Sequence, residues 1–197
     1  MVILLLLNNW LVLAAPGSVG AVESPKVVQL LIQTEKGEIE VALDAEKAPI
    51  TVANFLRYVD AGFYNGGQFH RTVTPKNQPD HRVKIEVVQA GINPEKAKNE
   101  FPPIKLERTN RTGLTHKDGA ISMARDGPDT ATSDFFICIG DQTELDYGGK
   151  RNPDGQGFAA FGRVVKGMQV VKQIQAAPAK EQMLSPPIKI LKIVRKQ

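Results

Sequence analysis

Few side chains in this 197-residue sequence have the chemistry of a nucleophile or a metal ligand. The three histidines are His70, His81 and His116, and no two of them have the HxxxH or HxH spacing of a zinc site. We interpret each as a loop or core histidine. The one cysteine, Cys138, lies in an apolar run and is predicted to be a buried structural thiol. The sequence therefore predicts no metal site and no cysteine nucleophile.

Two loops could also suggest catalysis. Three aspartates lie close to Arg125 in the sequence, namely Asp126, Asp129 and Asp134. An isolated acidic loop of this kind is a poor candidate for a paired-carboxylate hydrolase. The glycine-rich residues 147–157 lack the GK[ST] ending that a phosphate-binding loop requires before its helix. We interpret them as a long surface loop, and a hydrolase or a phosphate-binding protein is not favoured.

The N-terminal residues determine the expected compartment. Twelve of the fourteen residues at positions 2–15 are apolar, and the only tryptophan, Trp10, lies among them. The run is shorter than the roughly 20 residues of a membrane span, and small residues follow it as at a signal-peptidase site. No Lys or Arg precedes it. We predict a signal peptide at residues 1–21, with a retained anchor or a buried N-terminal helix as alternatives, and a periplasmic or secreted protein.

Residues 22–197 are predicted to form a single domain. The chain is 42% hydrophobic and 23% charged, which is ordinary for a globular protein and excludes a disordered or fibrous one. The formal net charge is +4, and the basic residues after position 180 have no interleaved aromatic residues. We interpret this end of the chain as a solvated surface. We expect a monomer that binds no nucleic acid and, after signal removal, no membrane.

Strand patterns dominate this domain. Strands are predicted at residues 27–33, 38–43, 67–73, 83–89, 120–125, 134–139, 158–165 and 188–194. The first two form a hairpin with Ile39, Val41 and Leu43 facing inward, and the alternation of the last one slips near Leu191, as at a bulge. Helices are predicted at residues 49–62 and 167–175. Because alternating βα units are absent, we predict a mainly β fold in which one antiparallel sheet closes on itself.

Five motifs, far apart in the sequence, occur together in one order. They are residues 69–71 (FHR), 87–91 (VVQAG), 121–125 (ISMAR), 133–137 (SDFFI) and 161–168 (FGRVVKGM). This set resembles the cyclophilin family of peptidyl-prolyl cis-trans isomerases over residues 27–194, and the N-terminal segment makes the chain most similar to secreted or periplasmic bacterial members. The resemblance implies a closed eight-stranded antiparallel β-barrel capped by two α-helices. It also implies proline-containing unfolded or extended polypeptides as substrates, and no cofactor.

Isomerase chemistry fits these residue types. Rotation about a peptide bond faces a barrier of about 18–20 kcal/mol, and no bond is broken, so neither a nucleophile nor a metal is needed. By resemblance, Arg71 is the catalytic donor, against the alternative of an ion-paired surface arginine, and Gln89 positions the substrate backbone. The other residues that the resemblance assigns to substrate binding are Phe69, Val87, Ala124, Arg125, Asp126, Phe136, Leu145 and Phe158. Strand periodicity predicts that His70 faces away from Phe69 and Arg71.

Several residues depart from the family pattern. Glu86 falls where the best-studied eukaryotic relatives have a pocket phenylalanine, Glu144 at the position of the tryptophan associated with cyclosporin binding, and Asp134 where a glutamine is common. Phe158 replaces a histidine of the site, and Arg125 replaces an asparagine. A carboxylate buried against an apolar macrocycle is costly, so we predict weak cyclosporin binding. The alternative function is a proline-peptide binding module or chaperone with little isomerase activity, and residues 147–157 are expected at the groove rim.

Overall fold

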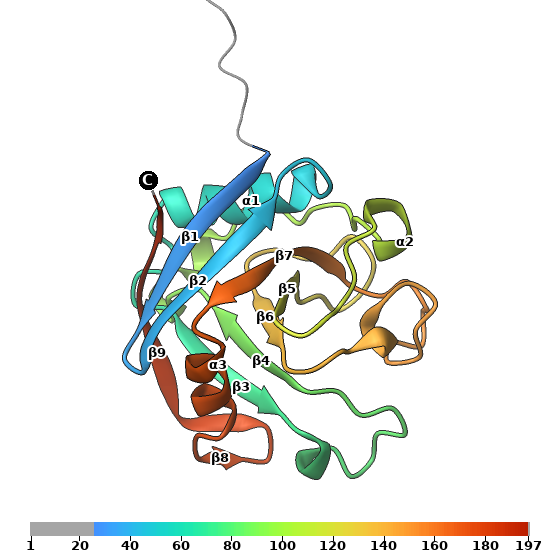
Figure 1. Cartoon of the computed structure of the whole chain (residues 1–197). Helices are drawn as coiled ribbons and strands as arrows, with labels where there is room; N and C mark the ends of the chain where they lie inside the picture. Colours follow the sequence, from blue (N-terminus) through green and yellow to red (C-terminus); the bar gives the residue numbers. More distant parts are fainter. Residues whose placement is uncertain (1–25, 197) are drawn as a thin grey trace, which may run out of the picture.

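Eight antiparallel strands close into a barrel in the computed structural model, which describes residues 26–196 (Figure 1). The sheet runs in the order β1-β2-β7-β5-β6-β4-β3-β9, and β9 pairs with β1 to close it. The strands are β1 (Val27–Thr34), β2 (Gly37–Asp44), β3 (Gln68–Val73), β4 (Val87–Gly91), β5 (Ala120–Met123), β6 (Phe135–Cys138), β7 (Ala159–Lys166) and β9 (Met183–Arg195). The two-residue strand β8 (Ala179–Lys180) pairs only with β9. The predicted barrel is confirmed.

The β1–β2 hairpin shows why these residues form strands. Apolar and polar side chains alternate along both strands, so one face can be buried while the other meets water. Leu30, Ile32, Ile39, Val41 and Leu43 point into the barrel and have no exposed surface. Burial of each is worth about 1.5–3 kcal/mol, so the alternation fixes which face of the sheet turns inward.

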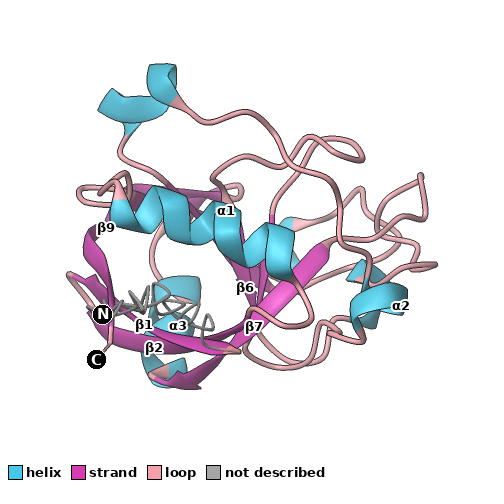
Figure 2. Cartoon of the chain, turned by 90° about the horizontal axis from the view of Figure 1, so that it is seen from above, coloured by secondary structure: helices cyan, strands magenta, loops and turns pink. Residues whose placement is uncertain are grey.

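Helices cover the two ends of the barrel. α1 (Pro49–Asp60) lies across one end, and α3 (Met168–Gln175) lies near the other (Figures 1 and 2). Proline at the first position of α1 costs no hydrogen bond, and Gly62 follows its end with a φ of 67°. Val52 and Phe55 of α1 are buried against the barrel interior. Both predicted helices are therefore confirmed.

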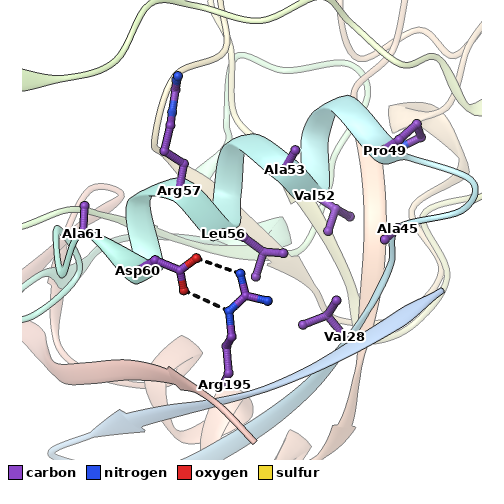
Figure 3. A pocket seen from close by; sticks show the side chains of 10 residues that line it. All are labelled: Val28, Ala45, Pro49, Val52, Ala53, Leu56, Arg57, Asp60, Ala61 and Arg195. Carbon is purple, nitrogen blue, oxygen red and sulfur yellow. Dashed lines mark hydrogen bonds and ion pairs between the residues drawn. The ribbon is translucent and has the colours of Figure 1, made fainter. Parts of the chain in front are cut away.

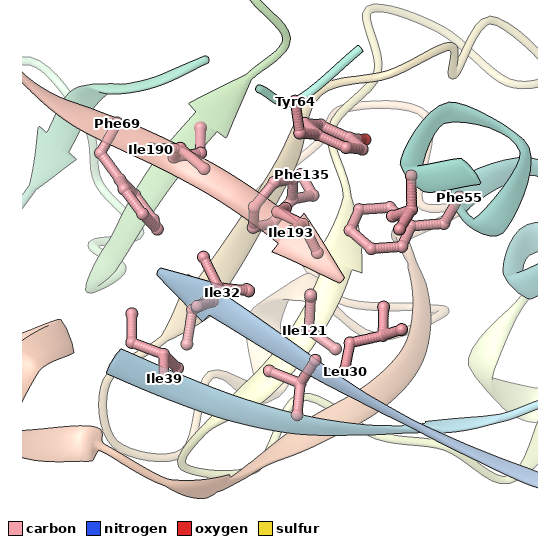
Figure 4. Close-up of a cluster of buried hydrophobic side chains, with 14 of the residues drawn as sticks. Leu30, Ile32, Ile39, Phe55, Tyr64, Phe69, Ile121, Phe135, Ile190 and Ile193 are labelled. Carbon is pink, nitrogen blue, oxygen red and sulfur yellow. The ribbon is translucent and has the colours of Figure 1, made fainter. Parts of the chain in front are cut away.

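Aromatic rings fill the barrel beneath α1 (Figure 4). Phe55 of α1 meets Phe135 of β6 edge to face, with ring centroids 5.3 Å apart, and Tyr64 lies 5.6 Å from Phe135. Burial raises the pKa of the Tyr64 hydroxyl, which donates a hydrogen bond to the Ser133 carbonyl. We call this interior the inner cluster; its members include Leu30, Ile32, Ile39, Val41, Leu43, Phe55, Tyr64, Phe69, Val88, Ile121, Phe135 and Phe161.

The strand predicted at residues 83–89 is wrong at its start, because β4 begins only at Val87. The preceding residues satisfy their backbone groups with side-chain amides instead of a neighbouring strand. Gln78 accepts from the Ile85 N–H at 3.3 Å and donates to the Ile85 carbonyl at 2.7 Å, and Gln142 accepts from the Glu86 N–H at 3.1 Å. Apolar alternation alone cannot distinguish such a segment from a strand.

The last strand also differs from its prediction, since β9 begins at Met183 rather than at residue 188. Pro186 and Pro187 lie between two stretches of its pairing with β3, which is interrupted between Ile188 and Met183. Proline has no N–H to donate to a ladder, and for that reason this part of the sequence does not resemble a strand. The prediction consequently missed the β8–β9 hairpin.

The predicted slip near Leu191 is confirmed. The register between β1 and β9 passes from Lys192 directly to Ile190, and Leu191 is 53% exposed. Short helical turns that the sequence did not predict lie in the connections: α2 (Thr109–Thr112), η1 (Pro75–Asn77), η2 (Pro94–Asn99) and η3 (Thr143–Leu145).

The predicted signal peptide at residues 1–21 lies outside the described residues. Within residues 26–196, no helix has the length and apolar character needed to cross a membrane.

Candidate active site

The two faces of the barrel wall carry different sets of apolar side chains. Along β4 and β6, residues such as Val88 and Phe135 point inward, and their neighbours Val87 and Phe136 point outward. The outward set is a second buried group, which we call the outer cluster: Val73, Ile85, Val87, Ala120, Phe136, Cys138 and Leu145. A groove of about 630 Å³ borders it, and Ile85 belongs to both.

A β-bulge in β3 places Arg71 in this groove. Phe69 pairs with Ala90 and Arg71 pairs with Gln89, so His70 is an extra residue between the two pairs. Phe69 therefore points inward, is fully buried and does not reach the groove, and its predicted contact with substrate is wrong. His70 lies on the side of Arg71, close to Asp134 of the groove lining, so the prediction that it faces away from Arg71 is also wrong, because strand periodicity fails at a bulge.

Amide oxygens hold the guanidinium of Arg71. Its Nη1 donates to Gln89 Oε1 at 3.0 Å, and its Nε and Nη2 donate to Gln182 Oε1 at 2.9 and 2.5 Å. Among residues 26–196, no carboxylate forms an ion pair with it, so the alternative of an ion-paired arginine is not supported. Burial lowers the pKa of Arg71, but an arginine stays charged at neutral pH.

Gln89 connects Arg71 to an acidic residue. Its Nε2 donates to Asp134 Oδ2 at 3.2 Å while its Oε1 accepts from Arg71, so both ends of the amide are used. Asp134 Oδ2 also lies 3.6 Å from Nε2 of His70. Burial raises the pKa of the Asp134 carboxyl, although His70 and the Gln89 hydrogen bond oppose this shift.

Gln182 is a residue of the site that the sequence did not reveal. It lies in the turn between β8 and β9, and its Nε2 donates to the Asn77 carbonyl at 3.0 Å while its Oε1 accepts from Arg71. The contact joins residues 111 positions apart. A glutamine in a polar turn carries no sequence signal of such a role, and Gln182 belongs to none of the five motifs.

The structure brings the predicted pocket residues together. Phe136 and Phe158 pack edge to face with centroids 5.4 Å apart. Val87, Phe136 and Leu145 belong to the outer cluster, and Phe158 packs against it and lines the groove. Ile85 lines the groove as well. These side chains form an apolar floor next to Arg71.

A buried histidine supports this floor from behind. His116 has no exposed surface, and its ring stacks on Phe136 at 5.9 Å. Its Nδ1 lies 2.7 Å from Asp146 Oδ1 and its Nε2 lies 2.9 Å from Ser122 Oγ. Because both ring nitrogens are occupied, the interpretation of His116 as a core histidine is confirmed. Burial raises the pKa of the Cys138 thiol, which agrees with an unreactive structural cysteine.

Residues 124–126 form one edge of the groove, and Ala124, Arg125 and Asp126 all line it. The Arg125 side chain itself is only 1% exposed. Its nitrogens donate to the Gly157 carbonyl at 2.6 and 2.8 Å and to Asp154 at 2.8 and 3.0 Å, so it fastens the 147–157 loop. That loop supplies Arg151, Asn152 and Pro153 to the groove, which confirms its predicted place at the rim.

Two glutamates that depart from the family pattern point away from the groove lining. Glu86 accepts a hydrogen bond from Nε2 of Gln175 in α3 at 3.0 Å, and Ile85 takes its place at the pocket wall. Glu144 accepts from the Lys150 N–H at 2.8 Å and caps the start of the rim loop. Glu144 stands at the position of the family tryptophan that is associated with cyclosporin binding. Weak cyclosporin binding stays a prediction.

A larger groove, of about 690 Å³, lies between α1 and the barrel (Figure 3). Its lining is mostly apolar, and its acidic and basic side chains Asp60 and Arg195 bond to each other at 2.7 and 2.9 Å. Arg57 instead lies over the Phe101 ring, 3.9 Å from its centroid. No three metal-ligating side chains converge anywhere in residues 26–196. The groove at Arg71 is therefore the better candidate for chemistry.

Comparison with known proteins shows the family that this chain resembles. Residues 29–195 match the family model described as cyclophilin type peptidyl-prolyl cis-trans isomerase/CLD. The chain is 44% identical over 146 residues to peptidyl-prolyl cis-trans isomerase A of Dickeya dadantii, covering 74% of this chain and 70% of that protein. It is 37% identical over 144 residues to peptidyl-prolyl cis-trans isomerase B of Escherichia coli, covering 72% and 80%.

Solved structures share the fold. The chain is similar to the crystal structure of a cyclophilin type peptidyl-prolyl cis-trans isomerase from Cryptosporidium parvum, with a TM-score of 0.70 at 21% identity, covering 87% of this chain and 98% of that one. A crystal structure of the same kind in the presence of the dipeptide Ala-Pro gives a TM-score of 0.69, covering 86% and 99%.

Proposed function

Because the chain belongs to the cyclophilin family and is a peptidyl-prolyl cis-trans isomerase, we propose that the groove at the outer cluster is its active site and Arg71 its catalytic residue. The position of Arg71 carries this proposal. The guanidinium is held by two amide oxygens beside an apolar floor, and no carboxylate of residues 26–196 forms an ion pair with it.

The geometry suits rotation about an X–Pro bond. The proline ring occupies the apolar floor formed by Ile85, Phe136 and Phe158, which removes it from water. Arg71 donates a hydrogen bond to the imide nitrogen, which weakens the partial double bond as the nitrogen becomes pyramidal. Gln89 and Gln182 fix the guanidinium in advance, so little reorganisation is needed in the transition state.

The edge at residues 124–126 binds the substrate backbone in this proposal. The Ala124 N–H already donates to the Asp134 carbonyl at 2.8 Å and the Asp126 N–H to Thr130 Oγ1 at 3.2 Å, so the edge is rigid before substrate arrives. An extended peptide adds to such an edge through its main chain, which tolerates arginine at position 125.

We propose that the substrates are proline-containing unfolded or extended polypeptides outside the cytoplasm. A related structure was obtained in the presence of the dipeptide Ala-Pro, which supports a proline peptide as the ligand of this groove. The apolar residues 2–15 and the small residues after them support export of the chain to the periplasm or the medium, as in bacterial secreted members of the family. Export and folding of exported proteins as its task are parts of the same proposal.

Substitution of Arg71 tests the assignment. Arg71→Ala is expected to lower kcat/KM for a short X–Pro peptide by about 100-fold, the loss typical of one preorganised donor. Isomerisation is measured by NMR exchange, and peptide binding by chemical-shift titration. Arg163→Ala, which removes an exposed arginine of β7, is the matched control and should keep the wild-type rate.

Retained binding with lost rate in Arg71→Ala supports catalysis by this residue. Wild-type protein that binds proline peptides without accelerating their isomerisation would instead favour the alternative, a binding module or chaperone. Full activity of Arg71→Ala would remove Arg71 from the mechanism while leaving the family unchanged.

The proposed export has its own test. Cleavage after residue 21 removes Trp10, the only tryptophan, so the mature protein should show tyrosine emission without an indole band. Mass spectrometry of protein from the periplasm or medium checks the same cleavage. A protein recovered only from the cytoplasm, with Trp10 intact, would contradict the proposal.

A further inference from the structure

Of the three arginines that line the active-site groove, two form no ion pair within residues 26–196. Arg71 comes from β3, and Arg151 comes from the rim loop at residues 147–157. Nη1 of Arg151 donates to Gln78 Oε1 at 2.8 Å and to the Val83 carbonyl at 2.7 Å, so the side chain reaches across to the opposite wall. Its Nε and Nη2 form no hydrogen bond within residues 26–196, which leaves two donors for a ligand.

One short segment anchors both guanidinium groups. The Gln182 amide that accepts from Arg71 donates to the carbonyl of Asn77, and the Arg151 guanidinium donates to the next residue, Gln78. Gln78 has no exposed surface, and its Nε2 donates to the carbonyls of Thr74 and Ile85 at 2.8 and 2.7 Å. The two positive charges are therefore held in fixed positions at one end of the groove.

The charge of Arg151 has no partner in the described chain. The neighbouring arginine of the groove, Arg125, forms an ion pair with Asp154 at 2.8 Å, and Arg195 on the far side pairs with Asp60. No carboxylate of residues 26–196 comes as close to Arg151, whose pKa is lowered by burial and by the charge of Arg71. This end of the groove thus carries positive charge that no carboxylate of residues 26–196 pairs with.

The acidic side chains of the groove belong to a different wall. Glu100 bonds to the Ser133 and Thr132 hydroxyls, and Asp134 bonds to Gln89 and lies near His70. These contacts hold the carboxylates near the segment that follows residue 124. A peptide in the groove therefore meets negative charge along one wall and positive charge where the rim loop crosses.

We propose that Arg151 is a specificity-determining residue that binds a substrate carboxylate, so the enzyme prefers X–Pro segments with an acidic side chain next to the proline. The proposal rests on the isomerase function of the same groove. A planar guanidinium with two donor nitrogens unused matches a carboxylate, and the half-buried rim position, still open to solvent, keeps the gain modest.

Matched peptides test this preference. The catalysed kcat/KM is measured for Glu-Pro against Gln-Pro peptides and for Pro-Glu against Pro-Gln peptides, which examines both sides of the proline. Wild-type enzyme should favour glutamate in at least one pair by about threefold to fivefold at low salt. The ratio should fall close to one in Arg151→Gln. It should persist in Lys150→Gln, an equal charge change at the exposed neighbouring residue.

The salt dependence of the preference tests the proposal without a variant. The wild-type preference should shrink toward one as NaCl rises from about 20 mM to about 500 mM, because screening weakens exposed charge pairs. A ratio of one in both wild-type pairs, or a preference that survives in a folded Arg151→Gln, overturns the proposal. Turnover of the glutamine peptides separates the two claims, since its absence would contradict the isomerase assignment itself.

Discussion

The two sides of one barrel wall are built on different principles. On the inside, β4 and β6 contribute Val88 and Phe135 to a cluster of aliphatic and aromatic side chains that α1 covers. On the outside, the same strands contribute Val87 and Phe136 to a cluster that stays open to the groove. Hydrogen bonds from polar side chains fix the segments around that outer cluster, and these side chains are Gln78, Gln89, Gln142, Arg151 and Gln182.

The difference separates stability from activity. Burial of apolar area is non-directional, so the inner cluster depends on the volume and pattern of many side chains. A hydrogen bond depends on one partner at one distance, so the outer groove depends on a few individual amides. Changes inside should therefore lower the free energy of unfolding, and changes outside should mainly alter kinetics.

The largest expected effect compares adjacent phenylalanines. Phe135→Ala should lower the free energy of unfolding by about 3–5 kcal/mol, since it leaves a closed cavity in the inner cluster. Phe136→Ala should lower it less, because groove water can fill the space, and should raise KM for a proline peptide. Urea unfolding and isomerase kinetics measure the two effects. Equal stability losses with unchanged KM in Phe136→Ala would refute the distinction.

The next effect concerns the buried amide of Gln78. Gln78→Ala leaves the Ile85 N–H and two carbonyls without partners, which costs about 1–3 kcal/mol, concentrated in residues 74–86. We expect faster hydrogen exchange there and a lower kcat/KM. Gln173→Ala, on the exposed side of α3, is the control. Unchanged exchange at Ile85 would show that Gln78 does not hold this wall.

The fold could be predicted from the sequence because the residues of the inner cluster recur at regular intervals along the strands and helices that carry them. Alternation over β1 and β2 and the stripe of α1 each bury one face, so pattern alone located them. The prediction failed where side chains or prolines replace regular pairing. The side-chain amides of Gln78 and Gln142 form hydrogen bonds with the backbone before β4, and Pro186 and Pro187 interrupt the pairing of β9. Periodicity detects neither feature.

The site was predictable only through its motifs. Arg71 and Gln89 lie in two of them, and the structure places both in one groove. The bulge at His70 has no signature in residues 69–71, and it reversed the expected faces of Phe69 and His70 relative to Arg71. Gln182 reaches the site only because the β8–β9 turn folds beside β3, a contact that depends on the complete barrel.

A smaller effect is expected from Gln182 itself. Gln182→Ala removes one of the two amides that orient Arg71, a hydrogen bond to a charged group, and should lower kcat/KM by about tenfold. The apparent stability should stay close to that of the wild type. Gln182→Asn, with the same amide on a shorter side chain, should recover only part of the rate. Equal rates in Gln182→Ala and wild type would leave Gln89 as the sole positioning residue.

The smallest effect concerns pH and the charge of Asp134. Burial raises the pKa of this carboxyl above its ordinary value of 3.8, so the folded chain keeps a proton that the unfolded chain releases. Wild-type stability should therefore fall as pH rises from about the ordinary value through the raised pKa. Asp134→Asn removes this titration, so its stability relative to wild type should increase across that window and stay constant above it.

Urea unfolding at a series of pH values checks the sign for Asp134. The side chain is 41% exposed, so solvent screening keeps the change well below that of Phe135→Ala. The amide oxygen of the variant can still accept from Gln89 Nε2, and the weaker bond to this uncharged oxygen shifts the stability equally at every pH above the window, so only the pH-dependent part reports the titration. A stability difference with the opposite slope would mean that His70 and Gln89 outweigh burial, and that this wall of the groove favours the carboxylate.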